Sequence, residues 1–161
     1  MENHNDTTTV LFICLGNICR SPTAEAIFKK YVSDEGLDDQ FEIDSAGMIG
    51  NHEGSRADGR MRKHAEKRDF VLESLSRPFD KDVDFDRFDY IIAMDGSNIS
   101  DLKSRARNEA DLSKLHRMTD YCVGFDYDTV PDPYYGGAEG FELVLDILED
   151  SCKGLLDKIK K

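Results

Sequence analysis

The chain has 161 residues, of which 39% are hydrophobic, and its formal net charge at pH 7 is −12. This length and apolar content suit one α/β domain whose core is large enough to fold alone. The acidic balance argues against nucleic acid as a partner, because nucleic-acid phosphates require a basic protein face.

The N-terminal segment is polar and contains no apolar signal core. We therefore interpret residues 1–9 as a flexible tail and residues 10–161 as the folded domain. No apolar run is long enough to predict a membrane span, so we expect no membrane association.

Four short apolar runs predict strands, separated by segments with helical periodicity. They are Val10–Ile13, Phe41–Ile43, Tyr90–Met94 and Leu115–Met118. This alternation predicts a parallel sheet. The last segment is the clearest helix, because its apolar residues repeat on one face toward a lysine-rich end. These residues are Phe141, Val144, Leu145, Leu148, Cys152, Leu155, Leu156 and Ile159.

The segment Cys14–Ser21 joins the first strand to a helix that starts near Ser21. A chain that curls between a strand end and a helix N-terminus can point its amide N–H groups at one anion. Arg20 adds a guanidinium fork that suits two phosphate oxygens. The same amides and helix N-terminus favour the thiolate of Cys14. The segment therefore predicts a nucleophile inside a phosphate-binding loop.

Two other interpretations of this loop remain open. Cys14 and Cys19 have a spacing that zinc ligands use, but no second Cys or His pair follows at a matching spacing. Cys14 can also be an ordinary buried thiol at a strand end.

A proton donor for the leaving group is expected in the late segment Val130–Gly137, where two prolines stiffen a loop around Asp132. A carboxylic acid held beside a bound phosphate dianion retains its proton near neutral pH and can act as a general acid. The alternative is a plain surface turn, because Asp-Pro with a nearby glycine is common turn chemistry.

These motifs resemble those of the low-molecular-weight protein tyrosine phosphatases. The resemblance rests on Cys14–Ser21 with Pro22, Asp44-Ser45-Ala46-Gly47, Met94-Asp95 and Asp132-Pro133-Tyr134, and it runs from about Val10 to the C-terminus. It implies a single-domain three-layer α/β sandwich with a central, mostly four-stranded parallel sheet flanked by helices on both faces. It also implies phosphotyrosine proteins or small aryl phosphates as substrates, and inorganic phosphate or vanadate as site ligands.

The mechanism implied by the resemblance needs no metal and no other cofactor. Cys14 attacks phosphorus to form a cysteinyl-phosphate, Arg20 clamps the phosphate, and Asp132 first protonates the leaving group and then activates water. Ser45 and Asp95 are expected to support the site, with Ser45 holding an asparagine in a left-handed conformation. The residues expected to bind phosphate or substrate are Leu15, Gly16, Asn17, Ile18, Cys19, Ser21, Asn51, Tyr134 and Tyr135.

Three positions depart from the family pattern. Asn51 aligns with an aromatic residue that forms one wall of the cleft, so we expect a wetter and less selective cleft. A histidine that supports the loop in vertebrate members aligns with Ser74, while His64 is expected to be a solvent-facing helix residue without a role. Met48 replaces the usual threonine after the family's Ala-Gly, and its consequence is not derivable from the sequence.

The aliphatic Ile18 favours an aryl phosphate, because related phosphoarginine phosphatases carry threonine there. Arsenate reductases share the fold but use a pair of further cysteines on a mobile segment. Here Cys122, expected at a strand end, and Cys152, expected on the apolar face of the last helix, lie far apart in sequence and favour core packing. Cys19 and Cys14 form a candidate redox switch, with loop packing of Cys19 as the alternative.

Two functions of other classes remain open. One is a phosphate-binding module without turnover, and the other is a thiol redox protein that uses Cys14 and Cys19. Free thiols favour the cytoplasm as the location. A basic stretch is a candidate surface for steering phosphorylated substrates, although a solvated helix face is the favoured interpretation. This stretch consists of Arg56, Arg60, Arg62, Lys63, Lys67 and Arg68.

Overall fold

The computed structural model describes residues 7–160. The first strand begins at Thr8, so the boundary expected after residue 9 falls within that strand. The remainder of the expected tail, residues 1–6, lies outside the described residues.

Four parallel strands form one sheet, in the order β2-β1-β3-β4. Their bounds are Thr8–Cys14 for β1, Phe41–Gly47 for β2, Tyr90–Ala93 for β3 and Leu115–Arg117 for β4. All four strands were predicted, and β2 runs four residues beyond the predicted end. Cys14 pairs with Gly47 across the β1–β2 ladder, so the carboxyl ends of these strands meet at one edge.

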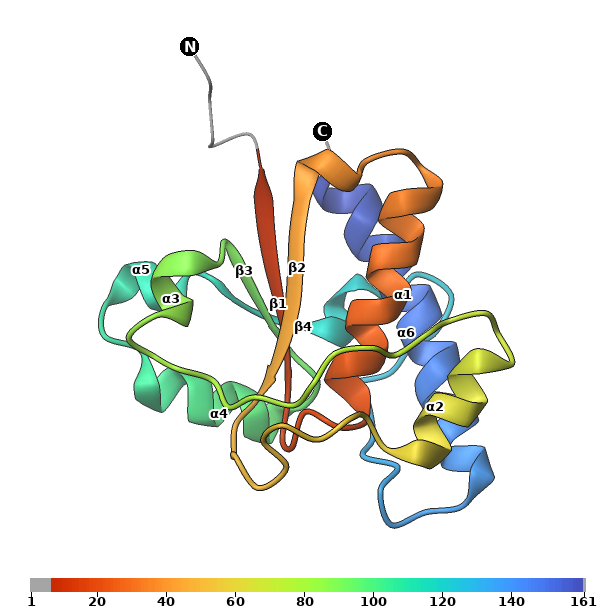
Figure 1. Cartoon of the computed structure of the whole chain (residues 1–161). Coiled ribbons are helices and arrows are strands. Elements are labelled where there is room, and N and C mark those ends of the chain that lie inside the picture. Colours follow the sequence, from red (N-terminus) through yellow and green to blue (C-terminus); the bar gives the residue numbers. More distant parts are fainter. Residues whose placement is uncertain (1–6, 161) are drawn as a thin grey trace.

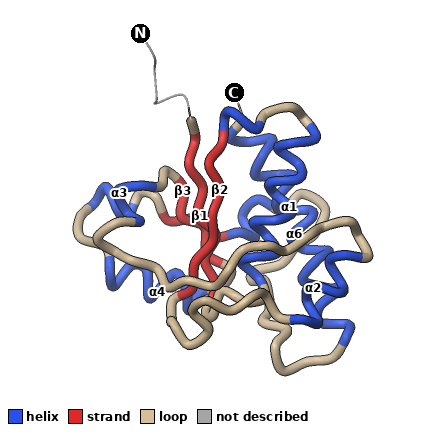
Figure 2. Tube along the Cα trace, in the orientation of Figure 1, coloured by secondary structure: helices blue, strands red, loops and turns tan. Residues whose placement is uncertain are grey.

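Helices cover both faces of this sheet, as Figures 1 and 2 show. On one side lie α1 (Arg20–Asp34), α2 (Gly59–Glu66) and α6 (Ala138–Ile159). On the other lie α3 (Asp84–Arg87), α4 (Gly96–Arg105) and α5 (Glu109–Leu112). Two 3₁₀ turns, η2 (Asp38–Gln40) and η3 (Met118–Tyr121), complete the elements. The expected three-layer sandwich is confirmed.

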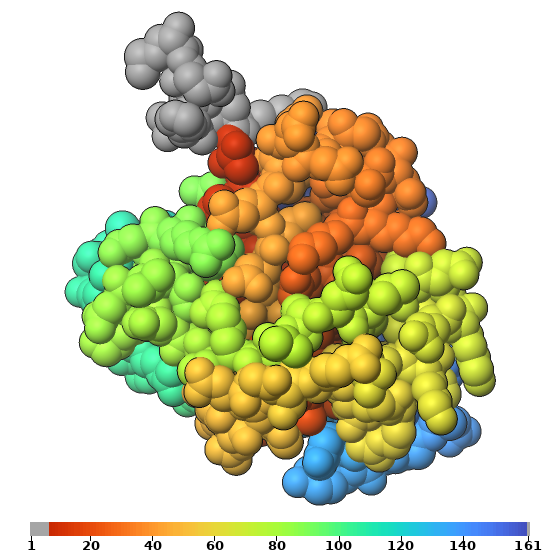
Figure 3. All heavy atoms as spheres, in the orientation of Figure 1, coloured from red at the N-terminus to blue at the C-terminus, as the bar shows by residue number. Residues whose placement is uncertain are grey.

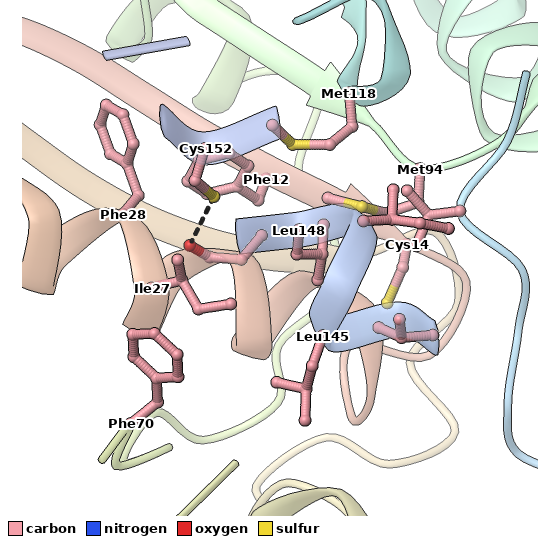
Figure 4. Packing of buried hydrophobic residues seen from close by; sticks show 14 of the residues in the cluster. Phe12, Cys14, Ile27, Phe28, Phe70, Met94, Met118, Leu145, Leu148 and Cys152 are labelled. Atoms are coloured by element: carbon pink, nitrogen blue, oxygen red, sulfur yellow. Dashed lines mark hydrogen bonds between the residues drawn. The ribbon is translucent and has the colours of Figure 1, made fainter. Parts of the chain in front are cut away.

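The strand β1 feeds two cores, because alternate side chains of a strand point to opposite faces. Phe12 packs toward α1 and α6, in one core cluster with Phe28, Leu145 and Leu148 (Figure 4). Leu11 packs into the second core on the opposite face. Since β1 is buried on both faces, its carboxyl end is a fixed platform for the loop that follows.

The two cysteines outside the loop have different surroundings. Cys152 is fully buried on the apolar face of α6, and its thiol lies 3.6 Å from the carbonyl of Ala24 (Figure 4). Core packing is confirmed for this residue. The expectation that Cys122 lies at a strand end is wrong, because β4 ends at Arg117 and Cys122 follows the turn η3.

Candidate active site

The loop from Cys14 to Cys19 closes tightly between β1 and α1. Its backbone is braced by the segment after β2, where Met48 N–H donates to the carbonyl of Cys14 and Ile49 N–H to that of Leu15, both at 3.0 Å. A Cβ at Gly47 would lie only 2.9 Å from the carbonyl oxygen of Leu15. Glycine at the end of β2 is therefore required for this close approach.

Asn17 organises the loop from its buried centre. Its φ of 58° places it in the left-handed region, as expected. The side-chain amide donates to Ser21 Oγ at 2.7 Å and to Ser45 Oγ at 3.0 Å. Its Oδ1 accepts from the backbone N–H of Arg77 at 3.0 Å. The predicted contact between Ser45 and the left-handed asparagine is present.

A buried carboxylate fixes the direction of these hydrogen bonds. Ser45 Oγ donates to Glu25 Oε1 at 2.6 Å, so Ser45 accepts from Asn17. Ser21 also accepts from Asn17, which leaves its own hydrogen for Cys14 Sγ at 3.1 Å. A hydroxyl that donates to sulfur stabilises the thiolate. Glu25, only 4% exposed, thus orients the Ser21 hydroxyl through the side chains of Ser45 and Asn17.

The guanidinium of Arg20 lies between the nucleophile loop and two acids. Its Nη1 donates to Asp95 Oδ2 at 2.7 Å and to the carbonyl of Val130 at 3.0 Å, while Nη2 lies 3.6 Å from Asp132 Oδ2. Burial opposes the charge, but Cys14, Asp95 and Asp132 outweigh it, so the pKa of Arg20 lies above its ordinary value. Arg20 therefore stays cationic and is held in one orientation.

Asp95 has two functions in the structure. Its Oδ2 holds Arg20, while its Oδ1 accepts the N–H of Asn98 and caps α4. The helix begins at Gly96, so Asp95 itself is the N-cap. An acidic N-cap supplies a carboxylate oxygen to the first turn and leaves the other oxygen free for Arg20.

A cavity of about 140 Å³ opens above the loop. It brings together the three predicted catalytic residues, while Asn17, Ser21, Ser45 and Asp95 are not part of its lining. Its lining consists of Cys14, Leu15, Gly16, Ile18, Ile49, Cys19, Arg20, Asn51, His52, Asp132, Tyr134 and Tyr135. Ile49 and His52 are the two lining residues that the sequence interpretation missed.

His52 lies beside Tyr134 in the lining of this cavity, with ring centroids 6.3 Å apart and planes inclined by 51°. Its ring also packs against the loop, because a Cβ at Gly16 would come within 3.2 Å of His52 Cδ2. Asn51 lines the cavity from an exposed turn. The signal that could have identified His52 is its ring, one position beyond the residue aligned with the aromatic wall.

Support for the loop comes from residues 76 and 77 rather than from Ser74. Ser76 Oγ donates to the carbonyl of Gly16 at 3.0 Å, and Arg77 N–H binds Asn17. The Arg77 guanidinium is itself held between Asp44 and Asp84. These residues lie in an irregular segment without periodicity, so the sequence contains no signal for their contacts with the loop.

The expectation that His64 is solvent-facing is wrong. It lies on α2, but its ring stacks on Phe141 with centroids 5.4 Å apart, and its Nδ1 contacts Glu142. Arg68 of the basic stretch pairs with three carboxylates of α6. Arg68 is thus engaged with α6 and is not free to steer substrates.

Cys19 is buried and free at the start of α1. Burial raises the pKa of its thiol well above the ordinary value, and the nearby negative charges of Asp58, Cys14 and Asp132 add to this effect. Cys19 therefore remains protonated at neutral pH. A thiol of this kind is a poor nucleophile compared with a thiolate.

Residues 7–160 lack the features that two other kinds of site require. No cluster of three His, Cys, Asp or Glu side chains in this part of the chain is arranged to hold a metal ion. Within the same residues, no helix is both long and apolar enough to cross a bilayer.

Comparison with known proteins identifies relatives along almost the whole chain. Residues 9–161 match the family described as low molecular weight phosphotyrosine protein phosphatase. A low molecular weight protein-tyrosine-phosphatase of Streptomyces coelicolor is 40% identical over 158 residues, which cover 96% of this chain and 95% of the relative.

Solved structures agree with this assignment. The crystal structure of a protein tyrosine phosphatase from Entamoeba histolytica, with Hepes in its active site, has a TM-score of 0.92 and 45% identity, covering 96% of this chain and 97% of its own. A Drosophila arginine phosphatase has a TM-score of 0.86 and 33% identity, covering 94% and 98%. This chain belongs to the low molecular weight phosphotyrosine protein phosphatase family.

Proposed function

We propose that this chain hydrolyses phosphotyrosine and related aryl phosphomonoesters, with Cys14 as nucleophile, Arg20 as phosphate ligand and Asp132 as general acid and base. The observation that carries the proposal is the position of Arg20. Its guanidinium lies 3.6 Å from Asp132, and it follows the loop that begins at Cys14. A phosphate bound to this guanidinium would lie between a thiolate and a proton donor.

The reaction then proceeds in two displacements. The Cys14 thiolate attacks phosphorus, the bond from phosphorus to the aryl oxygen breaks, and Asp132 gives its proton to the departing oxygen. The ionised Asp132 next takes a proton from water, which attacks phosphorus and breaks the bond to sulfur. Ser21 donates to the released thiolate. Loop amides and Arg20 hold the equatorial oxygens in both steps.

The walls of the cavity favour an aromatic leaving group. An aryl ring that enters the cavity meets the rings of His52 and Tyr134, which both line it. Ile18 adds an aliphatic surface. Asn51 makes the outer part of this cleft polar, so we expect modest selectivity among aryl phosphates, and competition by inorganic phosphate or vanadate.

Phosphoarginine is the second candidate substrate, because the Drosophila structural neighbour is an arginine phosphatase. A phosphoarginine peptide tested beside a phosphotyrosine peptide separates the two. We expect the higher kcat/KM on phosphotyrosine, because Ile18 presents no polar group to a guanidinium leaving group.

Cys19 is proposed as the partner of Cys14 in a reversible disulfide. Because its raised pKa keeps Cys19 protonated, a peroxide reacts first with the Cys14 thiolate, which takes one peroxide oxygen to become a sulfenic acid while the other leaves as water or alcohol. The sulfenic acid then condenses with the Cys19 thiol to form the disulfide and releases water. Dependence on a free Cys14 thiol also favours a reducing compartment, the cytoplasm.

The deciding experiment is steady-state hydrolysis of an activated aryl phosphate and a phosphotyrosine peptide, with reductant and without added metal. Wild type is compared with Cys14→Ser and Asp132→Asn. We expect turnover by wild type, none by Cys14→Ser, and a loss in Asp132→Asn that is larger on the poorer leaving group. Wild type that binds vanadate without turnover would instead indicate a binding module.

A thiol redox function is separated by Arg20→Ala. We expect this variant to lose phosphatase activity while its thiols still oxidise, because oxidation does not require a phosphate ligand. Retained phosphatase turnover in Arg20→Ala would overturn the proposed mechanism.

A further inference from the structure

The segment that carries Asp132 is irregular and, apart from the buried Pro133, largely exposed, and hydrogen bonds attach it at two points. Upstream, Val130 is buried, its N–H donates to the carbonyl of Met94 at 2.9 Å, and its carbonyl accepts from Arg20. Downstream, the carbonyl of Tyr134 accepts from Arg60 Nη2 at 2.9 Å. Asp132 lies between these two attachments, and its Oδ1 accepts the N–H of Tyr134 at 3.0 Å.

The downstream attachment is built on three contacts of one guanidinium. Besides its hydrogen bond to the Tyr134 carbonyl, the Arg60 guanidinium carbon lies 5.4 Å from the Tyr134 ring centroid and 4.9 Å from that of Phe141. Phe141 is a buried residue in the first turn of α6. Figure 3 shows the yellow segment of α2 beside the blue segment that leads into α6. Arg60 thus joins the acid segment to two helices.

Asp58 connects this guanidinium to the phosphate loop. Both carboxylate oxygens of Asp58 accept from Arg60, at 3.2 Å from Nε and 3.0 Å from Nη2. The backbone N–H of Asp58 donates to the carbonyl of Ile18 at 2.8 Å. Direct contacts therefore run from Ile18 through Asp58, Arg60 and Tyr134 to Asp132.

We propose that Arg60 is a positioning residue that sets the height of Asp132 above the phosphate loop. The inference rests on the proposed function, in which Asp132 protonates the leaving group. Without Arg60 the acid segment keeps its upstream attachment at Val130 and the burial of Pro133, but it loses the hydrogen bond at the Tyr134 carbonyl. Proton transfer in the transition state is sensitive to displacements of about 1 Å. The result is a general acid that is present but displaced.

Leaving-group dependence separates this role from a general loss of stability. A poor leaving group, such as the phenol of tyrosine with a pKa of about 10, depends on protonation far more than an activated nitrophenol does. A loosened Asp132 therefore lowers kcat/KM for phenyl phosphate and phosphotyrosine more than for p-nitrophenyl phosphate. The ratio kcat/KM is the correct measure because it reports the first displacement, before the cysteinyl-phosphate is hydrolysed.

The experiment measures kcat/KM across a series of aryl phosphates for wild type, Arg60→Met, Arg60→Lys and the control Arg62→Met. Arg62 lies on the same helix, but its Nε bonds to the carbonyl of Ala57. We expect Arg60→Met to lose about tenfold on phenyl phosphate and less than about twofold on p-nitrophenyl phosphate. Arg60→Lys, which keeps the charge without the fork, falls between Arg60→Met and wild type, and Arg62→Met matches wild type.

Two further results decide the proposal. The leaving-group slope is the dependence of log kcat/KM on the pKa of the leaving phenol across the series. In an Asp132→Asn background, Arg60→Met is expected to change this slope no further, because both variants impair the same proton transfer from residue 132 to the leaving group. The proposal is overturned if Asp132→Asn steepens the slope while Arg60→Met and Arg60→Lys leave it unchanged, or if Arg60→Met loses activity equally on every substrate. A slope that is unchanged even in Asp132→Asn overturns the general-acid assignment itself.

Discussion

The nucleophile loop and the acid segment meet at one phosphate site but are held by different means. Asn17, Ser21 and Ser45 are at most 2% exposed and bond to one another and to Glu25. Asp132, in contrast, has a side chain 42% exposed in a segment attached through Val130 and Arg60. In the proposed mechanism the site thus combines a preorganised nucleophile with an adjustable proton donor, and damage to the two parts should have different kinetic signatures.

The largest effect is expected from breaking the contact between the two regions with Arg20→Lys. A lysine keeps the charge but cannot bond simultaneously to Asp95, the Val130 carbonyl and a bidentate phosphate. We expect kcat/KM to fall by about 10²- to 10³-fold on good and poor leaving groups alike. Arg87→Lys, at the exposed pair with Glu42, is the matched control and should retain wild-type activity. Activity within fivefold of wild type in Arg20→Lys would contradict this account.

A smaller loss of activity is expected from Glu25→Ala. This variant removes the carboxylate at the end of the buried hydrogen-bond chain that runs through Ser45 and Asn17 to Ser21. Ser45 then loses the acceptor for its hydroxyl, which costs about 1–3 kcal/mol in the free energy of unfolding. Activity should fall about tenfold, because the Ser21 hydroxyl is no longer oriented toward sulfur. Denaturant unfolding and kcat/KM measure the two effects.

Matched variants sharpen this test. Glu25→Gln retains an acceptor oxygen for Ser45 and should keep most of the activity. Lys29→Met removes only the half-exposed partner of Glu25 and should change stability by less than about 1 kcal/mol. Loss of activity in Lys29→Met equal to that in Glu25→Ala would show that the ion pair, rather than the orientation of hydroxyl groups, is what matters.

At the rim of the cavity, His52→Ala should affect substrate binding more than chemistry. One aromatic contact contributes about 0.5–1.5 kcal/mol, so KM for aryl phosphates should rise about two- to tenfold with kcat little changed. The inhibition constant of inorganic phosphate should not change, because phosphate does not reach the wall. Asn51→Ala is the control, and a KM effect there as large as in His52→Ala would assign the wall to the wrong residue.

The last and smallest expected effect is a difference in chemical reactivity among the cysteine thiols. Burial holds the pKa of Cys19 far above its ordinary value, and burial with Asp150 nearby raises that of Cys122 to about 11. Both thiols are therefore protonated at every pH below about 9. Iodoacetamide at pH 7 should label Cys14 and be blocked by phosphate, as peptide mapping would show. Rapid labelling of Cys19 would contradict this arrangement.

The predictable parts of the site are those encoded over short stretches of sequence. The run from Val10 to Ser21 contains strand, loop and helix start in sequence, so its nucleophile and cation could be identified without a structure. Asp132 was identified from the two prolines that flank it. Each of these signals depends on local backbone preferences, which a sequence displays directly.

The contacts that sequence could not reveal join distant segments. Glu25 has the appearance of a surface residue on a helix, and only the approach of β2 places Ser45 against it. Ser76 and Arg77 support the loop from a segment without periodicity. Arg60 stood out only as one of several basic residues, and the fold alone brings α2 beside Tyr134. Such pairings arise from tertiary packing, which leaves no periodic trace in the sequence.

Asp95 has a consequence for the helix layer on the far side of the sheet. One of its oxygens binds the phosphate ligand Arg20 and the other caps α4, so occupancy of the site and fraying of that helix are thermodynamically linked. An anion that fixes Arg20 should also restrain Asp95, and amide hydrogen exchange in the first turn of α4 should slow when phosphate binds. A helix that contributes no residue to the cavity lining would thus report its occupancy.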